Sequence, residues 1–159
     1  MVVDLVGADA TEALGRRLAD LVRAGDLIIL TGGLGAGKTT LTRGLGTALG
    51  VRGPITSPTF VVARHHPHLT GGTGLIHVDA YRVGSVAEID DLDLLDRAGE
   101  AVTVVEWGAE RVEHLSPNRL HLHLAEDEHD PLLRRVRIEA IGPRWAGIDL
   151  AVLQPPADA

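Results

Sequence analysis

The chain has 159 residues, of which 45% are hydrophobic and 23% charged, and this balance predicts one soluble globular domain with its own core. Its net charge of −7 disfavours a protein that grips nucleic acid with a broad basic surface, so we expect no DNA partner, and any RNA contact to need a partner protein. The chain has no cysteine, no apolar run as long as a membrane span and no signal-peptide pattern, so we expect a cytoplasmic protein without disulfides or membrane contact.

Hydrophobic periodicity predicts strands and helices in alternation along the chain. Strands are expected at residues 2–6, 27–30, 75–79, 101–105, 119–124 and 133–141. Helices are expected at residues 9–22, 38–49, 109–115 and 145–153, with one or two short acidic helices within residues 85–99. Asp9 and Glu12 match a capping box at the start of the first helix, and Gly50 ends the second. Pro54 and Pro58 exclude a helix after it and predict an exposed loop that leads into a strand, followed by a turn-rich connection at residues 65–74.

This order predicts an α/β fold with a mainly parallel central sheet flanked by helices. The strands at residues 119–124 and 133–141 are expected to form a late antiparallel pair. We find no repeat and no linker, so we expect a single domain over residues 1–153 and a frayed C-terminal tail over residues 154–159. Ligand loops in such folds lie at the C-terminal ends of the parallel strands, which places the candidate site on one rim of the sheet.

The stretch GGLGAGKT at residues 32–39 matches the phosphate-binding pattern G-x-x-x-x-G-K-[ST] in full. An apolar strand comes before it and a helical pattern after it, which is the context that a P-loop NTPase-like fold requires; a turn without a ligand is the alternative. Glycines let consecutive N–H groups point at an anion, Lys38 reaches the outer phosphates, and the Thr39 hydroxyl can ligate Mg²⁺. Lys38 is also the only lysine among 15 lysine and arginine residues. The residues expected to bind the nucleotide are Gly32, Gly33, Leu34, Gly35, Ala36, Gly37, Lys38, Thr39 and Thr40.

A phosphate-bound Mg²⁺ ion needs a second oxygen ligand besides a hydroxyl. Asp79 and Glu106 each stand at the end of an apolar strand, and both are placed to serve. One can hold the metal while the other polarises the attacking water, and the sequence does not divide these roles. A helix cap or a solvent-facing strand end is the simpler alternative for either residue.

Other side chains are placed to act beside these acids. Residues 56–60, TSPTF, carry three hydroxyls in a loop of the kind that senses an outermost phosphate, although such residues also simply make turns. Arg82 can reach a phosphate or pair with an acid, with a surface position as the alternative. Phe60, Tyr81 and Trp107 sit beside these groups, where core packing is the more common use of an aromatic ring and stacking on adenine the less common one.

The histidines invite a metal interpretation that the sequence does not favour. His65, His66 and His68 cluster in one stretch, and His121 and His123 share one strand face. Neither set has an evident third and fourth ligand, so we expect solvated or packed histidines. The acidic run at residues 88–96 is expected to be a solvated helix face.

Four motifs together resemble the bacterial TsaE family, also called YjeE, the P-loop ATPases of tRNA threonylcarbamoyladenosine biosynthesis. They are GGLGAGKTTLTRGL, SPTF at residues 57–60, HVDAYR at residues 77–82 and VVEW at residues 104–107. The resemblance implies a Mg²⁺-dependent ATPase that works with partners like TsaB and TsaD. It would support threonylcarbamoyl transfer to adenosine 37 of tRNA without performing the transfer, and would meet tRNA only through the complex.

The resemblance also implies roles for individual residues. Lys38 and Thr39 would serve the phosphates and Mg²⁺, Glu106 would be the metal-linked acid, Asp79 the acid of the second motif, and Thr59 a switch hydroxyl. The family usually has Asp where this chain has Gly33, and commonly a Gly within the stretch that here reads DLDLLD.

Two other functions are compatible with the same phosphate loop. A small-molecule kinase would need an arginine-bearing lid, and we see no compact arginine-rich segment. A nucleotide-dependent binding switch with negligible turnover alone would use the same loop. A GTPase is disfavoured, since its N-K-x-D guanine motif needs a second lysine and Asn118 is followed by Arg119.

Overall fold

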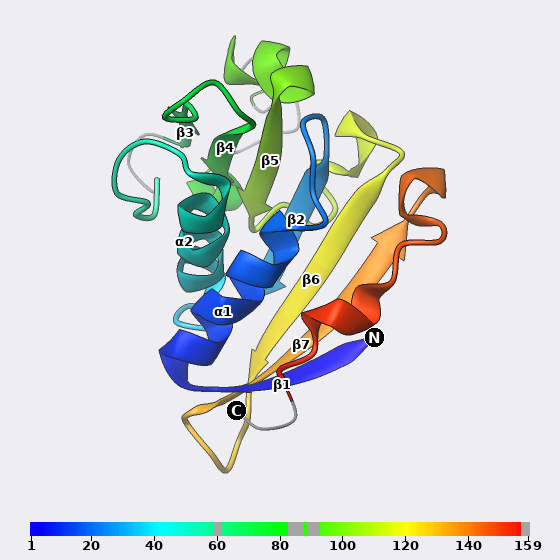
Figure 1. The fold of residues 1–159 in the computed structure, drawn as a ribbon. Helices are drawn as coiled ribbons and strands as arrows, with labels where there is room; N and C mark the ends of the chain where they lie inside the picture. Colours follow the sequence, from blue (N-terminus) through cyan, green and yellow to red (C-terminus); the bar gives the residue numbers. More distant parts are fainter. Residues whose placement is uncertain (59–61, 83–87, 89–92, 157–159) are drawn as a thin grey trace.

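The computed structural model describes residues 1–58, 62–82, 88 and 93–156. In this part of the chain one sheet of seven strands has the order β1-β7-β6-β2-β5-β4-β3 (Figure 1). The strands are β1 Val2–Val6, β2 Leu27–Gly32, β3 Ala63–His66, β4 Gly74–Asp79, β5 Ala101–Glu106, β6 Arg119–Glu126 and β7 Leu133–Ile141. The α-helices are α1 Gly7–Ala19 and α2 Lys38–Leu49. Short 3₁₀ helices lie at Ala80–Arg82, Asp93–Glu100, Glu113–Leu115, Pro143–Trp145 and Leu150–Leu153.

The centre of the sheet is parallel and its margins are antiparallel. β2 pairs in parallel with both β5 and β6, and β4 pairs in parallel with β5. β7 runs antiparallel to β6 and β1, and β3 runs antiparallel to β4. The α/β class and the late antiparallel pair are therefore confirmed, and the parallel strands bring the ends of β2, β4 and β5 to one rim.

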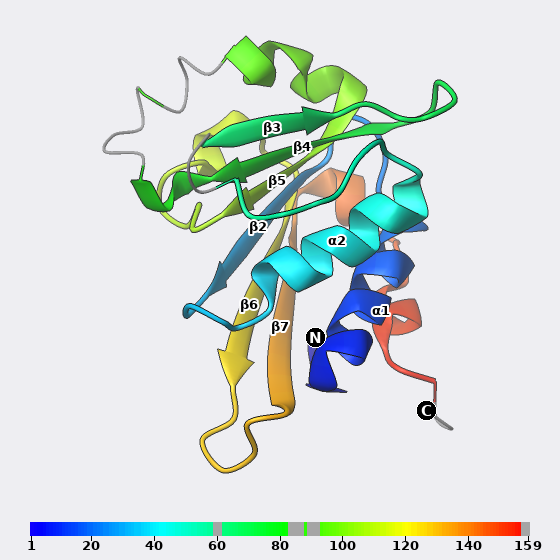
Figure 2. The same ribbon diagram turned by 90° about the vertical axis from the view of Figure 1, so that its left-hand side faces the viewer.

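Both α-helices pack side by side on the same face of the sheet (Figure 2). Four of their leucines are fully buried in the main core: Leu14, Leu18, Leu41 and Leu45. The helices approach so closely that a methyl group on Gly44 would overlap the backbone oxygen of Glu12. The opposite face carries a smaller apolar cluster, which includes Val112 and against which Leu115 packs.

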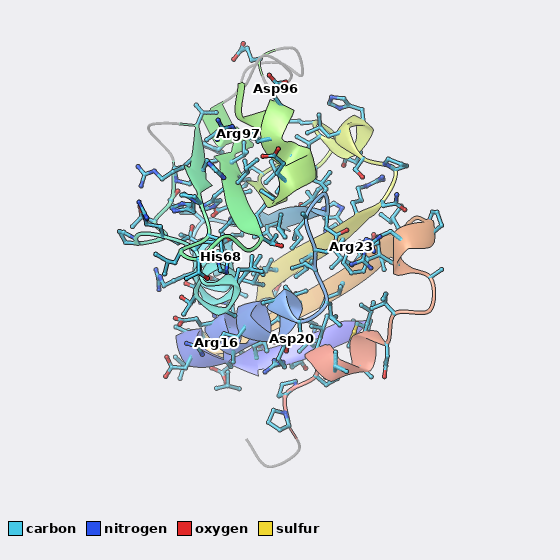
Figure 3. All side chains as sticks on the ribbon, turned by 45° about the horizontal axis from the view of Figure 1, so that its top comes forward. Arg16, Asp20, Arg23, His68, Asp96 and Arg97 are labelled. Carbon is cyan, nitrogen blue, oxygen red and sulfur yellow. The ribbon has the colours of Figure 1, made fainter. Side chains whose placement is uncertain are left out.

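The structure corrects the expected start of the first helix. α1 begins at Gly7, directly after β1, and has no side-chain hydrogen bond at its N-cap Val6. Gly7 turns the chain with a φ of 79°, so Asp9 already lies inside the helix and the capping box does not form. Glu12 instead forms an ion pair with Arg16 on the outer surface of the helix. Figure 3 labels this Arg16 together with Asp20, the C-cap residue of α1.

Three other expectations differ from the structure. The predicted helix at residues 109–115 is a turn that ends in the single 3₁₀ turn Glu113–Leu115, and the predicted helix at residues 145–153 is replaced by two 3₁₀ segments. The stretch that was expected to be only a connection contains the end of β3, because the backbone of His65 and His66 pairs with β4. Within the acidic stretch the described residues are helical as expected, with residue 88 in a helix and residues 93–99 in the 3₁₀ helix Asp93–Glu100.

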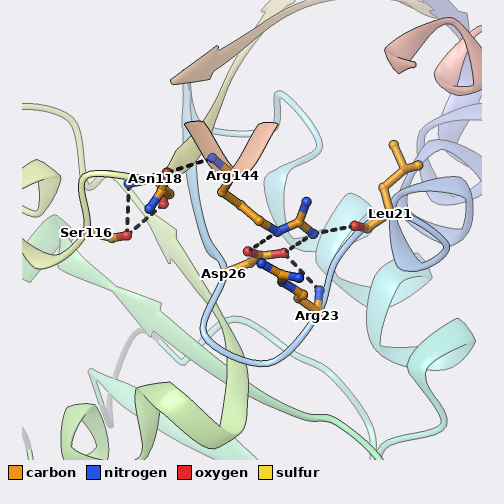
Figure 4. A network of polar contacts seen from close by, with 6 residues as sticks. All are labelled: Leu21, Arg23, Asp26, Ser116, Asn118 and Arg144. Carbon is orange, nitrogen blue, oxygen red and sulfur yellow. Dashed lines mark hydrogen bonds and ion pairs between the residues drawn. The ribbon is translucent and has the colours of Figure 1, made fainter. Parts of the chain in front are cut away.

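A buried ion pair joins the C-terminal segment to the loop before β2. The guanidinium of Arg144 donates to both carboxylate oxygens of Asp26, at 3.1 and 2.9 Å, and to the carbonyl of Leu21 at 2.8 Å (Figure 4). The Asn118 side chain accepts from the Arg144 N–H at 2.9 Å. Such a bidentate pair is geometrically specific. It therefore fixes the start of β2, the strand that leads into the candidate site, against the C-terminal segment that carries Arg144.

Candidate phosphate-binding site

The loop between β2 and α2 has the backbone that the glycine pattern predicts. Gly35 and Gly37 have φ angles of 83° and 102°, in the left-handed region that side chains disfavour. Gly37 is also the N-cap of α2, so the helix starts at Lys38 as expected, with its positive dipole end directed at the loop. The site therefore has the geometry of an anion-binding helix terminus.

The Lys38 side chain lies under this loop. Its ammonium donates to the carbonyls of Gly32 and Gly33, at 2.8 and 2.7 Å, and lies 4.0 Å from the centre of the Trp107 ring. Burial lowers the pKa of Lys38 from its usual value, while the carboxylates of Glu106 and Asp79 act in the opposite direction. The single lysine of the chain is thus the cation that faces both predicted acids.

Glu106 is the centre of a buried polar cluster at the end of β5. One carboxylate oxygen, Oε1, accepts a hydrogen bond from the Thr39 hydroxyl at 2.9 Å and lies 2.7 Å from His77 Nε2. Both Glu106 and His77 are almost completely buried. A hydroxyl and a carboxylate that touch each other at the start of a phosphate-loop helix are an oxygen pair of the kind that Mg²⁺ prefers.

Asp79 ends β4 and is the direct register partner of Glu106 on β5. Its Oδ1 accepts the backbone N–H of Tyr81 at 3.0 Å, and its Oδ2 accepts from the Ser57 hydroxyl at 3.4 Å. Asp79 is therefore partly a local cap, as the simpler alternative holds, but it lies on the same rim as Glu106. The parallel pairing of β4 and β5 brings the two acids together.

A cavity of about 470 Å³ opens onto this rim. A volume of this size is within the usual range for small-molecule sites. Its lining is Leu34, Gly35, Gly37, Lys38, Thr39, Thr40, Ser57, Asp79, Tyr81, Glu106 and Trp107. Three other predicted residues do not line the cavity. The carbonyls of Gly32 and Gly33 accept hydrogen bonds from Lys38, and the side chain of Ala36 is buried in the core. A Cβ on Gly33 would meet no atom within 4 Å, so the acid usual in the resembled family has room here.

Two predicted residues are only partly described or not described. Thr59 and Phe60 lie outside the described residues. The expectation that Thr59 supplies a switch hydroxyl therefore stays a prediction. Arg82 ends the 3₁₀ helix Ala80–Arg82, and its side chain lies outside the described part.

Sequence reasoning assigned no role to His77 and only a weak one to the aromatic pair. Trp107 has a φ of 61°, a strained value for a residue with a side chain, and its ring lies 5.2 Å from that of Tyr81 across the mouth of the cavity. The signal for His77 was its position two residues before Asp79 on the same buried strand, which places both side chains on one face.

The histidine expectations divide. His66 is buried and packed, with Nδ1 donating to the Arg52 carbonyl at 3.1 Å, as expected for a structural histidine. For the pair on β6 the expectation stays a prediction, and the structure adds a third group, since Glu139 on β7 lies near His121 and His123. None of the described helices is long and apolar enough to cross a membrane.

Known proteins are similar to this chain over most of its length. The family model for "Threonylcarbamoyl adenosine biosynthesis protein TsaE" matches residues 5–136. A Streptomyces coelicolor protein named tRNA threonylcarbamoyladenosine biosynthesis protein TsaE is 55% identical over 143 residues, which are 88% of this chain and 97% of that protein. The Bacillus subtilis protein of the same name is 33% identical over 140 residues, 88% of this chain and 85% of that protein.

A solved structure is similar throughout. The crystal structure of Bacillus subtilis YdiB superposes with a TM-score of 0.74 at 28% sequence identity, and the match covers 92% of this chain and 88% of that one. The fold and the sequence therefore point to the same family.

Proposed function

This chain belongs to the TsaE family of tRNA threonylcarbamoyladenosine biosynthesis proteins, and on that premise we propose that it binds ATP with Mg²⁺ and hydrolyses the ATP in support of that modification. The partners would be proteins like TsaB and TsaD, and the chain would meet tRNA through their complex. The observation that carries the proposal is the contact of Thr39 with Glu106 directly beside Lys38.

The residues of the candidate site suit a nucleoside triphosphate. The glycine loop and the start of α2 offer N–H groups and a positive dipole end to phosphate oxygens. Lys38 needs to exchange only its two bonds to the loop carbonyls for bonds to phosphate oxygens. Tyr81, which is 63% exposed, and Trp107 offer aromatic faces at the edge of the cavity.

Thr39 and Glu106 suit Mg²⁺, because both present oxygens at the helix start. When bound, Mg²⁺ neutralises charge on the transferring phosphoryl group. His77 keeps the Glu106 carboxylate in place, and Lys38 adds positive charge where the outer phosphate would lie. Asp79, oriented by the Tyr81 N–H, is the second acid on the rim and would orient the attacking water.

The test is ATP hydrolysis by the pure protein, alone and with the TsaB and TsaD partners and tRNA. We expect Lys38→Ala to lose ATP binding and Thr39→Ala to lose hydrolysis by at least about tenfold, as when a positioning group of a phosphoryl-transfer site is removed. Thr47→Ala is a matched control, because it makes the same change at an exposed position of the same helix. Thermal unfolding of each variant checks the fold.

Other outcomes would contradict the proposal. Intact binding and stimulated hydrolysis in Lys38→Ala would show that the phosphates lie elsewhere. Phosphate transfer to a metabolite would favour the kinase, and tight ATP binding without turnover in the full complex would favour the binding switch.

A further inference from the structure

A second polar cluster lies on β6 and β7, outside the proposed ATPase site. Residues two apart on a strand point to the same face, so His121 and His123 share a face, opposite the buried leucines of β6. Glu139 is the direct antiparallel partner of His121 on β7. The two strands run side by side in the half of the sheet away from β3 (Figure 1).

The three side chains converge. The rings of His121 and His123 stack with their centres 3.9 Å apart. His123 Nε2 lies 3.8 Å from Glu139 Oε2, and one ligand atom from each of the three residues lies within 4.8 Å of the others. Tetrahedral Zn²⁺ with bonds of about 2.0–2.2 Å places its ligand atoms roughly 3.3 Å apart. The stacked imidazoles therefore have to rotate apart and the half-exposed Glu139 has to turn, which closes gaps of up to about 1.5 Å.

The hydrogen bonds of the histidines suit a cation. Among the described residues, His123 Nε2 is buried without a hydrogen-bond partner. His121 is oriented by the Thr31 hydroxyl, which lies 2.8 Å from its Nε2, an outer contact of the kind that fixes metal-ligating histidines.

We propose that His121, His123 and Glu139 form a binding site for a transition-metal dication of the Zn²⁺ class, with water in the remaining position. Two imidazoles and one carboxylate select zinc and its neighbours in the series over Mg²⁺ or Ca²⁺, which prefer oxygen-only shells. The charges around the cluster are mixed, with Glu113 and Glu139 favouring a cation and Arg119 and Arg137 opposing it. The site goes beyond the proposed ATPase function and does not depend on it.

The experiment is a Zn²⁺ titration of the untagged full chain in competition with a chromophoric chelator. We expect one ion per chain with micromolar or tighter affinity, and visible absorption of tetrahedral Co²⁺ when cobalt replaces zinc. His123→Gln and Glu139→Gln should each weaken binding by at least about tenfold, since losing a ligand costs no less than losing an outer hydrogen bond. Both residues are partly exposed, so the fold should persist, and thermal unfolding verifies this.

Two control variants make the test specific. His129→Gln removes a histidine whose side chain is 92% exposed in the β6–β7 turn, and binding should not change. Glu106→Gln removes the carboxylate proposed for Mg²⁺, and Zn²⁺ binding should again not change. Absence of stoichiometric binding, unchanged affinity in His123→Gln, or loss of binding in Glu106→Gln alone would overturn the site.

Discussion

At the scale of single residues, the decisive group is His77. It is completely buried on β4, its Nε2 lies 2.7 Å from Glu106, and the Thr39 hydroxyl contacts the same carboxylate oxygen. Leaving a buried polar group without its partner costs about 1–3 kcal/mol, so this histidine both stabilises Glu106 and orients it. His77 is thus a positioning residue for the proposed hydrolysis.

Replacement of His77 should separate these two effects. We expect His77→Leu to lower kcat for complex-stimulated ATP hydrolysis by roughly 10- to 100-fold with little change in KM, because Glu106 loses its orientation while the phosphate loop persists. His77→Gln, which keeps a side-chain donor, should recover part of the rate. His66→Leu is the control, since it removes another buried histidine on the adjacent strand without touching the cavity. Equal kcat losses in His66→Leu and His77→Leu would mean that the effect is only structural.

At the scale of elements, α1 packs closely against α2, the helix that begins directly after the phosphate loop. Gly44 on α2 faces the backbone of Glu12 on α1 with no space for a methyl group. Helix propensity alone would favour alanine by about 1 kcal/mol, whereas overpacking a rigid contact costs about 1–3 kcal/mol. The packing effect should therefore be the larger of the two.

The corresponding variant is Gly44→Ala, which we expect to lower the free energy of unfolding in urea denaturation by about 1–2 kcal/mol. Gly99→Ala is the control, because a Cβ there would meet no atom within 4 Å. A Gly44→Ala protein as stable as the parent would show that the two helices can move apart without cost.

At the scale of the whole molecule, buried histidines make stability depend on pH. Burial is the main cause of the lowered pKa of His66, and Nδ1 is already committed to the Arg52 carbonyl. The unfolded chain, with an ordinary histidine pKa of about 6.5, binds a proton at higher pH than the folded chain does. His121 shifts in the same direction.

Stability should accordingly be retained above about pH 6.5 and fall as the pH is lowered from there toward the folded-state pKa values. Urea unfolding at several pH values between 7 and 5.5 measures the slope, and His66→Gln should make it shallower. A slope that His66→Gln leaves unchanged would place the titrating groups elsewhere.

Comparison of the whole fold with the sequence shows which elements local patterns could predict. Local patterns predicted β2, β4, β5, the late hairpin and the phosphate loop, because burial on both faces and a glycine-rich turn leave strong local signals. They mispredicted the start of α1, where a single glycine turn after β1 outweighed the Asp9 capping pattern. They could not show that β3 extends to His66, because His65 and His66 are part of the strand through pairing with β4 and not through their composition.

By itself, the sequence determined which chemical groups the candidate site contains: a glycine-rich loop with a lone lysine, and two acids at the ends of apolar strands. Only the tertiary structure decided which groups meet. Parallel pairing of β4 with β5 brings His77 to Glu106, 29 residues apart, and β6 with β7 brings Glu139 to His121. The physical reason is that local propensity acts over a few residues, whereas register and burial across a sheet join residues whose separation along the chain carries no signal of their contact.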